Sequence, residues 1–344
     1  MLTLLDMRDD ARWKQRFRVP SIATSQIAEA NPARGLVVTN LPGVYQLHAW
    51  DTASGALYQR TDLPAGVVFG GISSDGAYVY YLHDAHGNEV GHFVRVPFEG
   101  GPPQSLTPDL PPYATWFLSE SKSGSAIGLT AAGADGFKMY LIPKAPDGTL
   151  GAPQVVYASA RLSYGPLLSH DAEYAVIATT ERSQHTDMAL MAFDLRADAT
   201  QQTVRVLQET DGDLSPVAFS PLKGDARLLA STNVTGFDRP VIWDVSSGSR
   251  LDIPLQGIDG SVHPRAWSPD AQSILVMQVS EARNQLYIYD LTRSTLHKLN
   301  HPDGVIAAAY FHGKDEIYAH FQSATQPAAL IALDAVSGAQ KRVV

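Results

Sequence analysis

Cysteine is absent from the 344-residue chain. Disulfide bonds, thiolate zinc sites, iron–sulfur clusters and cysteine nucleophiles are therefore all excluded. Packing and hydrogen bonds must stabilise the fold instead. The length is sufficient for this, because a chain of about 300 residues buries roughly 75% of the surface that it exposes when unfolded.

Long apolar runs and clusters of basic residues are also missing. No window comes near the roughly 18 consecutive apolar residues of a membrane-spanning helix. The segment Met1–Asp10 has aspartates where a signal peptide carries positive charge, and it lacks the apolar core of a signal peptide. The chain has 26 Lys and Arg residues against 35 Asp and Glu residues, a net charge of −9, whereas nucleic-acid phosphates require clustered positive charge. The sequence predicts a cytoplasmic protein with no membrane or nucleic-acid partner.

Helical periodicity is nearly absent after residue 20, but a repeat of roughly 50 residues is present. In its first marker, a short apolar stretch ends in a serine that precedes a polar turn. The successive copies are 46, 50, 51 and 48 residues apart, at Ser73, Ser119, Ser169, Ser220 and Ser268. A weaker copy spans Tyr310–Asp315. The second marker, in phase with the first, is an alternating apolar strand that ends at Asp51, Asp194, Asp244, Asp290 or Asp334.

Each marker has a mechanical explanation. An aspartate at a strand end accepts hydrogen bonds from the backbone N–H groups of the next turn, and the glycine of a Ser-Gly pair such as Ser247-Gly248 supplies the positive φ that closes a hairpin. Each unit then reads as four antiparallel strands, which is typical of a propeller blade. The chain is predicted to be an all-β, seven-bladed β-propeller of four-stranded antiparallel blades, with six or eight blades as alternatives.

The unit count also predicts the domain boundaries. A helical arm over residues 1–20 precedes a propeller over 21–344, with blades at approximately 22–61, 67–107, 114–158, 163–208, 214–256, 261–300 and 304–344. The first and last units each own four strands, so we expect a ring without strand exchange that is closed by packing between the first and last sheets. Because the chain stops on the last residue of a strand, we expect a domain cut from a longer polypeptide, with a natural end as the alternative.

Residues 2–19 form the one segment with a helical pattern. Trp13 and Phe17 fall on the same face as Leu5, and charged residues cover the rest of the helix. Two interpretations remain open for this short N-terminal helix. It caps one face of the propeller, or it docks through Trp13 and Phe17 on a domain outside this chain, which leaves both side chains exposed here.

Several segments resemble the N-terminal propeller of the prolyl-oligopeptidase family, and in particular its acylaminoacyl-peptidase-like bacterial branch. They are Trp13–Pro20, Gly43–Asp51 with Ser54-Gly55, His83–Phe93 with Glu99–Gly101, and Gly236–Asp244. Phrases such as Trp267-Ser-Pro-Asp270 also occur in TolB-like and WD-repeat-like propellers, whereas Gly87–Phe93 and Trp13–Pro20 narrow the resemblance. The resemblance covers essentially the whole chain.

The resemblance implies a serine peptidase whose propeller sits over an α/β-hydrolase domain and restricts access to short, unfolded peptides. In that family the nucleophile, acid and base all lie in the hydrolase domain. This chain has no Gly-x-Ser-x-Gly motif, because residues 124–128 have their serine in the wrong place for the strand-to-helix turn that exposes a nucleophile. No catalytic residue is therefore carried over and no cofactor is expected. The expected role is to gate and select short peptides for a hydrolase domain that this chain lacks.

Charged residues near the second-to-third-strand connections are candidate contacts of the channel or of a partner domain. They are Glu89, His92, Glu181, Arg182 and Arg239. Such connections gather on one face of a propeller. The alternative interpretation is that these side chains form surface salt bridges.

A metal site is the remaining alternative. His83, His86 and His92, with Asp84 and Glu89 among them, offer nitrogen and oxygen ligands for a divalent ion. A charged loop at a blade edge explains the same spacing, and we expect no bound metal. A metal would make a propeller lyase the third functional hypothesis. The first two are the peptidase propeller and a free-standing TolB-like propeller that binds proteins or small ligands.

Overall fold

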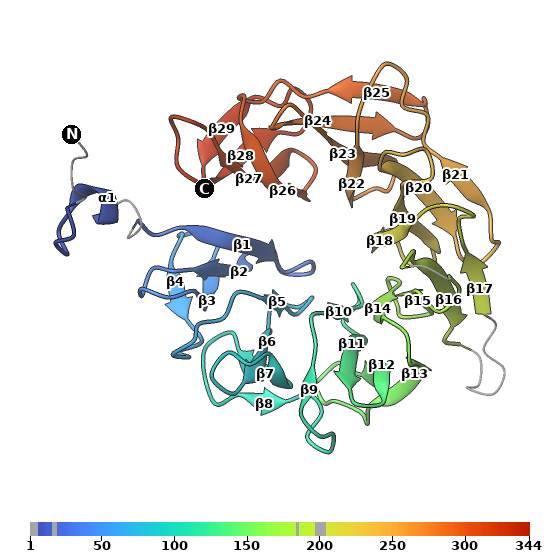
Figure 1. Cartoon of the computed structure of the whole chain (residues 1–344), viewed down its shortest axis with the longest axis horizontal. Coiled ribbons are helices and arrows are strands. Elements are labelled where there is room, and N and C mark those ends of the chain that lie inside the picture. The colour runs from blue at the N-terminus through green and yellow to red at the C-terminus, as the bar shows by residue number, and fades with distance from the viewer. Residues whose placement is uncertain (1–5, 16–18, 184–185, 197–203) are drawn as a thin grey trace.

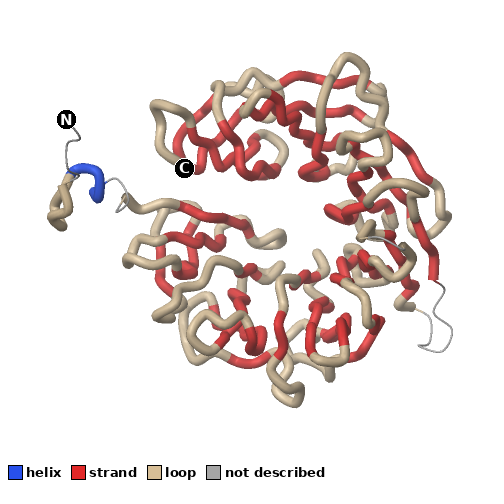
Figure 2. The backbone as a smooth tube through the Cα atoms, in the orientation of Figure 1, coloured by secondary structure: helices blue, strands red, loops and turns tan. Residues whose placement is uncertain are grey.

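The computed structural model describes residues 6–15, 19–183, 186–196 and 204–344. Within these ranges the single helix is α1 (Arg12–Gln15), and residues 6–11 of the predicted helix over residues 2–19 are not helical. No helix in the described part of the chain is long and apolar enough to cross a membrane. The other regular elements are β-strands, and their sheets follow one another around a ring (Figure 1). Figure 2 shows the same ring with its strands in red.

Five sheets have four antiparallel strands each, paired in sequence order, and these are the blades of a β-propeller. The first blade contains β1 (Ile22–Ile27), β2 (Arg34–Thr39), β3 (Gln46–Asp51) and β4 (Leu57–Gln59). The next contains β14 (Ser163–Leu168), β15 (Tyr174–Thr179), β16 (Ala189–Asp194) and β17 (Val204–Leu207). It is followed by β18 (Leu214–Phe219), β19 (Arg227–Thr232), β20 (Arg239–Asp244) and β21 (Arg250–Asp252). The fourth contains β22 (Val262–Trp267), β23 (Ser273–Ser280), β24 (Arg283–Asp290) and β25 (Thr295–Lys298). The last contains β26 (Val305–His312), β27 (Glu316–Gln322), β28 (Ala329–Asp334) and β29 (Gln340–Val343).

The strands of residues 70–159 form one continuous nine-stranded sheet. They are β5 (Gly70–Ile72), β6 (Tyr78–Asp84), β7 (Val90–Pro97), β8 (Gln104–Ser105), β9 (Tyr113–Ala114), β10 (Leu118–Glu120), β11 (Ala126–Gly133), β12 (Gly136–Pro143) and β13 (Gln154–Ser159). Strand β9 joins the predicted units 67–107 and 114–158, because Ala114 pairs with Val90 of β7 and with Ala132 of β11. The prediction of seven separate four-stranded blades is therefore wrong: the propeller has five such blades, and these strands merge into one sheet.

Tyr113 holds β9 in position between the two halves of the nine-stranded sheet. Its buried hydroxyl accepts a hydrogen bond from the backbone N–H of Phe93 at 3.1 Å and hydrogen-bonds to the hydroxyl of Thr107 at 2.9 Å. A segment that the sequence presents as a link between units thus contributes backbone pairing to both. Two residues are too few to produce an alternating pattern, so this pairing leaves no periodic signal in the sequence.

The first strand of each blade lies toward the centre of the ring and the fourth lies on the outside (Figure 1). We call one face of the ring the turn face. It carries the turns that follow the inner strands, at residues 28–33, 73–77, 121–125, 169–173, 220–226, 268–272 and 313–315. We call the opposite face the loop face. It carries the second-to-third-strand loops, at residues 40–45, 85–89, 134–135, 180–183, 186–188, 233–238, 281–282 and 323–328.

The predicted mechanics of the two sequence markers are confirmed. The hydroxyl of Ser268 donates to Asp270 at 2.7 Å and accepts the backbone N–H of Ser273 at 2.9 Å, which closes the turn after β22. The carboxylate of Asp244 accepts the backbone N–H groups of Ser246 and Ser247, both at 2.9 Å. Glycine follows in this turn with a φ of 83° at residue 248, as the Ser-Gly pair predicts.

Packing of apolar side chains joins the first blade to the last. Val37 and Trp50 of the first blade form one buried cluster with Tyr318, Leu330 and Ala332 of the last. In the described part of the chain, β1 pairs only with β2 and β29 only with β28, so no strand is shared across this seam. Side chains rather than backbone hydrogen bonds therefore close the ring.

Glu316, at the start of β27, bonds to side chains of the outer strand β29 of the same blade. Its carboxylate accepts hydrogen bonds from Arg342 at 2.5 and 2.9 Å and pairs with Lys341 at 3.0 Å. These contacts, that of Arg342 foremost, lower the pKa of Glu316 from 4.5 to about 2.

The lowered pKa of Glu316 makes its contribution to stability dependent on pH. A depressed pKa stabilises the fold above pH 4.5, and this stabilisation is lost as the pH falls toward 2. We expect Glu316→Gln to lower the free energy of unfolding by about 1 kcal/mol at pH 7, since half-exposed Arg342 is screened by solvent. Near pH 2 the variant and the unmodified chain should unfold alike. Urea denaturation at pH 7 and at pH 2 measures the loss in free energy of unfolding. An equal loss at both pH values would contradict the assigned role of Glu316.

Candidate functional site

The five charged candidates from the sequence lie on separate parts of the ring. Glu89 and His92 belong to the nine-stranded sheet, Glu181 and Arg182 follow β15, and Arg239 begins β20. No hydrogen bond or ion pair joins any two of them within the described ranges. They share the loop-face side of the propeller but do not form a site together.

Three of these candidates have local partners. The hydroxyl of Tyr157 donates a hydrogen bond to the carboxylate of Glu181. Arg239 donates to the carbonyl of Gly260 at 2.5 Å. The ring of His92 packs edge-on against Tyr113, with the ring centroids 5.6 Å apart. These contacts fit the surface-bonding interpretation as well as the interpretation as contacts to a partner.

The histidine-rich segment 83–92 surrounds a loop whose carboxylate is already engaged. Asp84 accepts the backbone N–H groups of Gly87 at 3.2 Å and Glu89 at 2.7 Å, and so organises the β6–β7 loop. A cavity of about 460 Å³ is bordered here by His83 and His86. Across the described residues, no group of three or more potential ligand side chains is placed to hold a metal ion.

Trp13 lies on α1 and is half buried. Its indole N–H donates to the carbonyl of Asp6, and the ammonium of Lys14 lies 5.6 Å from the centre of its ring. The indole is thus packed within the N-terminal segment itself rather than fully exposed. Phe17, the other predicted docking residue, lies outside the described residues.

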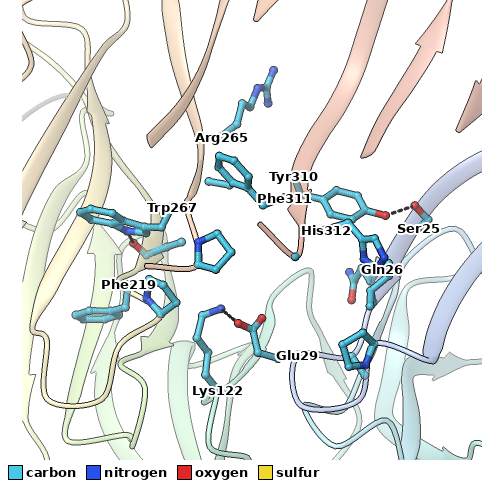
Figure 3. A pocket seen from close by; sticks show the side chains of 18 residues that line it. Ser25, Gln26, Glu29, Lys122, Phe219, Arg265, Trp267, Tyr310, Phe311 and His312 are labelled. Atoms are coloured by element: carbon cyan, nitrogen blue, oxygen red, sulfur yellow. Dashed lines mark hydrogen bonds and ion pairs between the residues drawn. The ribbon is translucent and has the colours of Figure 1, made fainter. Parts of the chain in front are cut away.

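A pocket of about 520 Å³ occupies the centre of the ring at the turn face (Figure 3). Its wall comes from the inner strands β1, β18, β22 and β26 and from the turns that follow inner strands. Aromatic side chains border it, among them Phe219, Trp267, Tyr310 and Phe311. A mainly apolar cavity of this size with a few polar groups is typical of a ligand site.

An ion pair spans part of the pocket's rim. Lys122, from turn 121–125, bonds at 2.5 Å to Glu29, from turn 28–33, and so links the nine-stranded sheet to the first blade (Figure 3). The backbone N–H of Ala30 also donates to the carbonyl of Ser74 at 2.8 Å, which joins the intervening turn to the same rim. The three turns 28–33, 73–77 and 121–125 are therefore linked to one another on this side of the pocket.

A serine and a histidine meet at the seam, but not as a catalytic pair. The hydroxyl of Ser25 hydrogen-bonds to Nε2 of His320 at 2.8 Å and to the hydroxyl of Tyr310 at 2.7 Å. Burial raises the pKa of Tyr310 to about 12 and lowers that of His320, so both groups are neutral near pH 7. Ser25 is buried, and within the described residues no carboxylate bonds to His320. These three residues join the first and last blades.

The serine markers were predicted to shape turns, but the pocket beside them was not predicted. Phe219 and Trp267 directly precede the marker serines Ser220 and Ser268, and the segment 310–312 belongs to the weaker copy of the same marker. The signal was present in the repeat. Inner strands of one ring end around a common centre, so the residues that precede the markers converge there.

About half of the exposed large apolar side chains in the described part of the chain lie on the loop face. In the second-to-third-strand loops and at their edges these are Leu41, Val44, Val90, Val234 and Phe237. Near the start of the inner strands and the end of β23 they are Val68, Phe69, Trp116, Leu162, Val305 and Val279. Trp116 is 46% exposed and Phe237 49%. On the described turn face the corresponding residues are Leu222 and Val336, with Leu57 and Val155 near the turn-face starts of β4 and β13. Apolar surface concentrated on one face is typical of an interaction surface.

Solved structures of prolyl oligopeptidases share this fold. One is from a study of two prolyl endopeptidases and of inter-domain dynamics in catalysis and specificity. It has a TM-score of 0.71 and 15% identity, and the match covers 94% of this chain and 48% of that one. Prolyl oligopeptidase B from Galerina marginata, as apo protein, matches with a TM-score of 0.69 and 13% identity. This match covers 92% of this chain and 49% of the enzyme. A mutant of the same enzyme, bound to a 35mer hydrolysis and macrocyclization substrate, matches with a TM-score of 0.67 and 13% identity. This match covers 92% of this chain and 48% of the enzyme.

The comparisons by sequence give no match: no protein-family model and no curated protein matches the chain. At identities of 13–15% the solved structures establish the fold. The chain spans about half the length of each of these enzymes. The likeness to prolyl oligopeptidases that the sequence predicts is confirmed as a likeness in fold, and it is consistent with the propeller domain of that family.

Proposed function

We propose that this chain is the non-catalytic propeller domain of a prolyl-oligopeptidase-like serine peptidase, and that it gates and selects short peptides for an α/β-hydrolase domain. The fold and the half-length match support this proposal. The sequence supports it as well, because Ser125, the serine of residues 124–128, lies in the turn between β10 and β11 rather than at the start of a helix. The hydrolytic chemistry then belongs to the other domain.

The apolar loop face is the observation that carries the proposal. Strand β1 begins at this face and β29 ends at it, so a domain connected to either strand would adjoin Trp116, Phe237 and the other exposed apolar side chains. Burying them would remove apolar surface from water at roughly 25 cal/mol per Å². In this arrangement Glu89, Glu181, Arg182 and Arg239 contact the hydrolase domain.

The central pocket supplies the selection step in this proposal. It opens at the turn face, opposite the apolar loop face, so peptides reach the hydrolase domain along the inner strands. The rim, with its pair between Lys122 and Glu29, sets the size of what passes. In this proposal the turns around the mouth, three of which are linked to one another, keep a folded protein out.

Substitutions on the loop face test the docking. We expect Trp116→Ser and Phe237→Ser to leave this chain folded and to lower its free energy of unfolding by about 1 kcal/mol, because roughly half of each side chain is exposed. In the protein produced from the complete coding sequence, each should weaken the contact between domains by more than about 1 kcal/mol. The loss should appear as reduced hydrolysis of short peptides and earlier thermal separation of the domains.

Val336→Ser is the matched control, since Val336 is an exposed apolar residue of the turn face. It should change neither hydrolysis nor domain separation. A coding sequence that contains no hydrolase would contradict the proposal and favour the free-standing TolB-like scaffold, with the pocket as its ligand site. Equal effects of all three substitutions would contradict docking through the loop face.

A further inference from the structure

One inner strand has a cation where its neighbour has an apolar residue, at a structurally matched position. The segment Pro264-Arg-Ala-Trp-Ser-Pro269 of β22 repeats Pro216-Val-Ala-Phe-Ser-Pro221 of β18, with Arg265 in the place of Val217. Both strands have a β-bulge here, because the pairing register shifts between Pro216 and Ala218 and again between Pro264 and Ala266. Bulges re-aim side chains, and only β22 of this pair places a cation at the bulge.

Among the residues that the structure describes, none pairs with the guanidinium of Arg265 as a counter-charge. Its Nε is inaccessible to solvent and has no hydrogen-bond partner, and its Nη2 contacts the sulfur of Met277 at 3.6 Å. No acidic side chain in the described part of the chain forms an ion pair with it, and burial lowers its pKa. Withdrawing a cation from water without a counter-charge is unfavourable. A binding site that receives an anion accounts for such an arrangement.

Arg265 borders the central pocket, on the opposite side from Lys122 and Glu29 (Figure 3). The charged residues of the wall are thus two cations and one carboxylate, and Lys122 already neutralises Glu29. His312 also borders the pocket, and burial lowers its pKa, so it is neutral near pH 7. The pocket is therefore positive inside a protein whose net charge is −9. Apolar walls such as Trp267 and Phe311 strengthen electrostatic attraction by keeping water away.

We propose that Arg265 is an anion anchor in the channel and binds a carboxylate of the peptide that occupies it. This inference rests on the proposed function, in which peptides pass through the channel. A guanidinium presents its N–H groups in a planar fork that matches the two oxygens of a carboxylate. The carboxylate belongs either to the C-terminus of the peptide or to an acidic side chain, and the two sources share the same chemistry.

Binding of labelled short peptides to the purified chain tests the anchor. Fluorescence anisotropy would compare a neutral peptide with a free C-terminus, the same peptide as C-terminal amide, and the amide with one internal glutamate. We expect Arg265→Val to weaken binding of the free acid by about 10- to 100-fold, the usual effect of losing a charge-assisted hydrogen bond in a buried site. The simple amide should bind weakly to the unmodified chain and equally weakly to the variant.

The controls separate this inference from the function on which it rests. Valine fits the bulge of β18 at Val217, so Arg265→Val is expected to fold, which circular dichroism verifies. Arg293→Val removes the same charge from an exposed turn and should leave binding unchanged. Tight binding of the glutamate-containing amide identifies an acidic side chain as the ligand, and its absence identifies the C-terminus.

Three results would overturn the anchor. Equal binding of acid and both amides, unaffected by Arg265→Val, overturns it while peptide passage through the channel survives. An equal loss with Arg293→Val shows that only overall charge matters. Binding of none of the peptides overturns both the anchor and peptide passage, whereas docking through the loop face is tested independently by the Trp116 and Phe237 variants.

Discussion

Replacing Trp50 with alanine is expected to lower the free energy of unfolding by about 3–5 kcal/mol, the usual range for removing a buried aromatic side chain, and also to open the ring. Trp50 packs in the buried cluster that joins the first and last blades, together with Tyr318 and Leu330. No backbone pairing crosses that seam within the described residues. A cavity at the seam therefore weakens the apolar packing that closes the ring there together with the hydrogen bonds of Ser25.

Trp243→Ala provides the matched control for the seam. Trp243 is equally buried, but it packs between two blades that are consecutive in the chain. Both variants should lose comparable stability in urea denaturation. Only Trp50→Ala should increase the radius of gyration under native conditions, as measured by small-angle X-ray scattering. An unchanged radius for Trp50→Ala, or an equal increase for Trp243→Ala, would show that the seam is not the weak point of the ring.

The second large effect is expected from Lys144→Met. This substitution should lower the free energy of unfolding by about 3–5 kcal/mol at pH 7, because it leaves a buried carboxylate without its cationic partner. The side chain of Lys144 is 3% exposed and bonds to Glu120 at 2.7 Å, and that of Glu120 is 6% exposed. Glu120 also accepts the backbone N–H of Ser74 at 2.8 Å, so the pair ties two turns of the nine-stranded sheet together. Lys122→Met is the control, since its partly exposed pair with Glu29 should contribute less than about 1 kcal/mol.

The cost of Lys144→Met should depend on pH in a defined direction. Burial raises the pKa of Glu120 above 4.5, and the bonds from Lys144 oppose this rise. Without Lys144 the pKa rises further. A raised carboxyl pKa gives stability that is complete below pH 4.5 and is lost as the pH rises through the folded-state pKa. In urea denaturation, the difference in free energy of unfolding between the variant and the unmodified chain should therefore be smaller at pH 4 than at pH 7. A difference in free energy of unfolding that does not change with pH would mean that Glu120 is not the destabilising group.

Much of the local architecture could be predicted because it repeats. The Ser-x-Asp turn at Ser268 and the aspartate-closed turn at Asp244 recur in phase, and each depends on hydrogen bonds within a few residues. The hydrogen-bonded fusion through Tyr113 and Ala114 could not be predicted in this way. It depends on a two-residue strand whose partners, Val90 and Ala132, lie about twenty residues away on either side. Counting repeats finds the units but cannot reveal that two of them share a sheet.

The candidate site was harder to predict than the fold. The residues predicted to form a site were charged residues in loops, such as Glu181 and Arg239, and these have local partners on separate parts of the ring. The apolar character of the loop face was missed because Trp116 and Phe237 lie in irregular segments, where no periodic pattern marks a buried or exposed side. Arg265 was within reach, since its alignment with Val217 is visible in the repeat, but its isolation from acidic groups required the structure.

An experimental structure of the protein produced from the complete coding sequence would test the central proposal most directly. The account predicts an α/β-hydrolase domain that covers Trp116 and Phe237 and places its nucleophile over the loop-face end of the inner strands. A hydrolase domain seated on the turn face, or a protein in which Trp116 and Phe237 stay in solvent with no second domain, would contradict it.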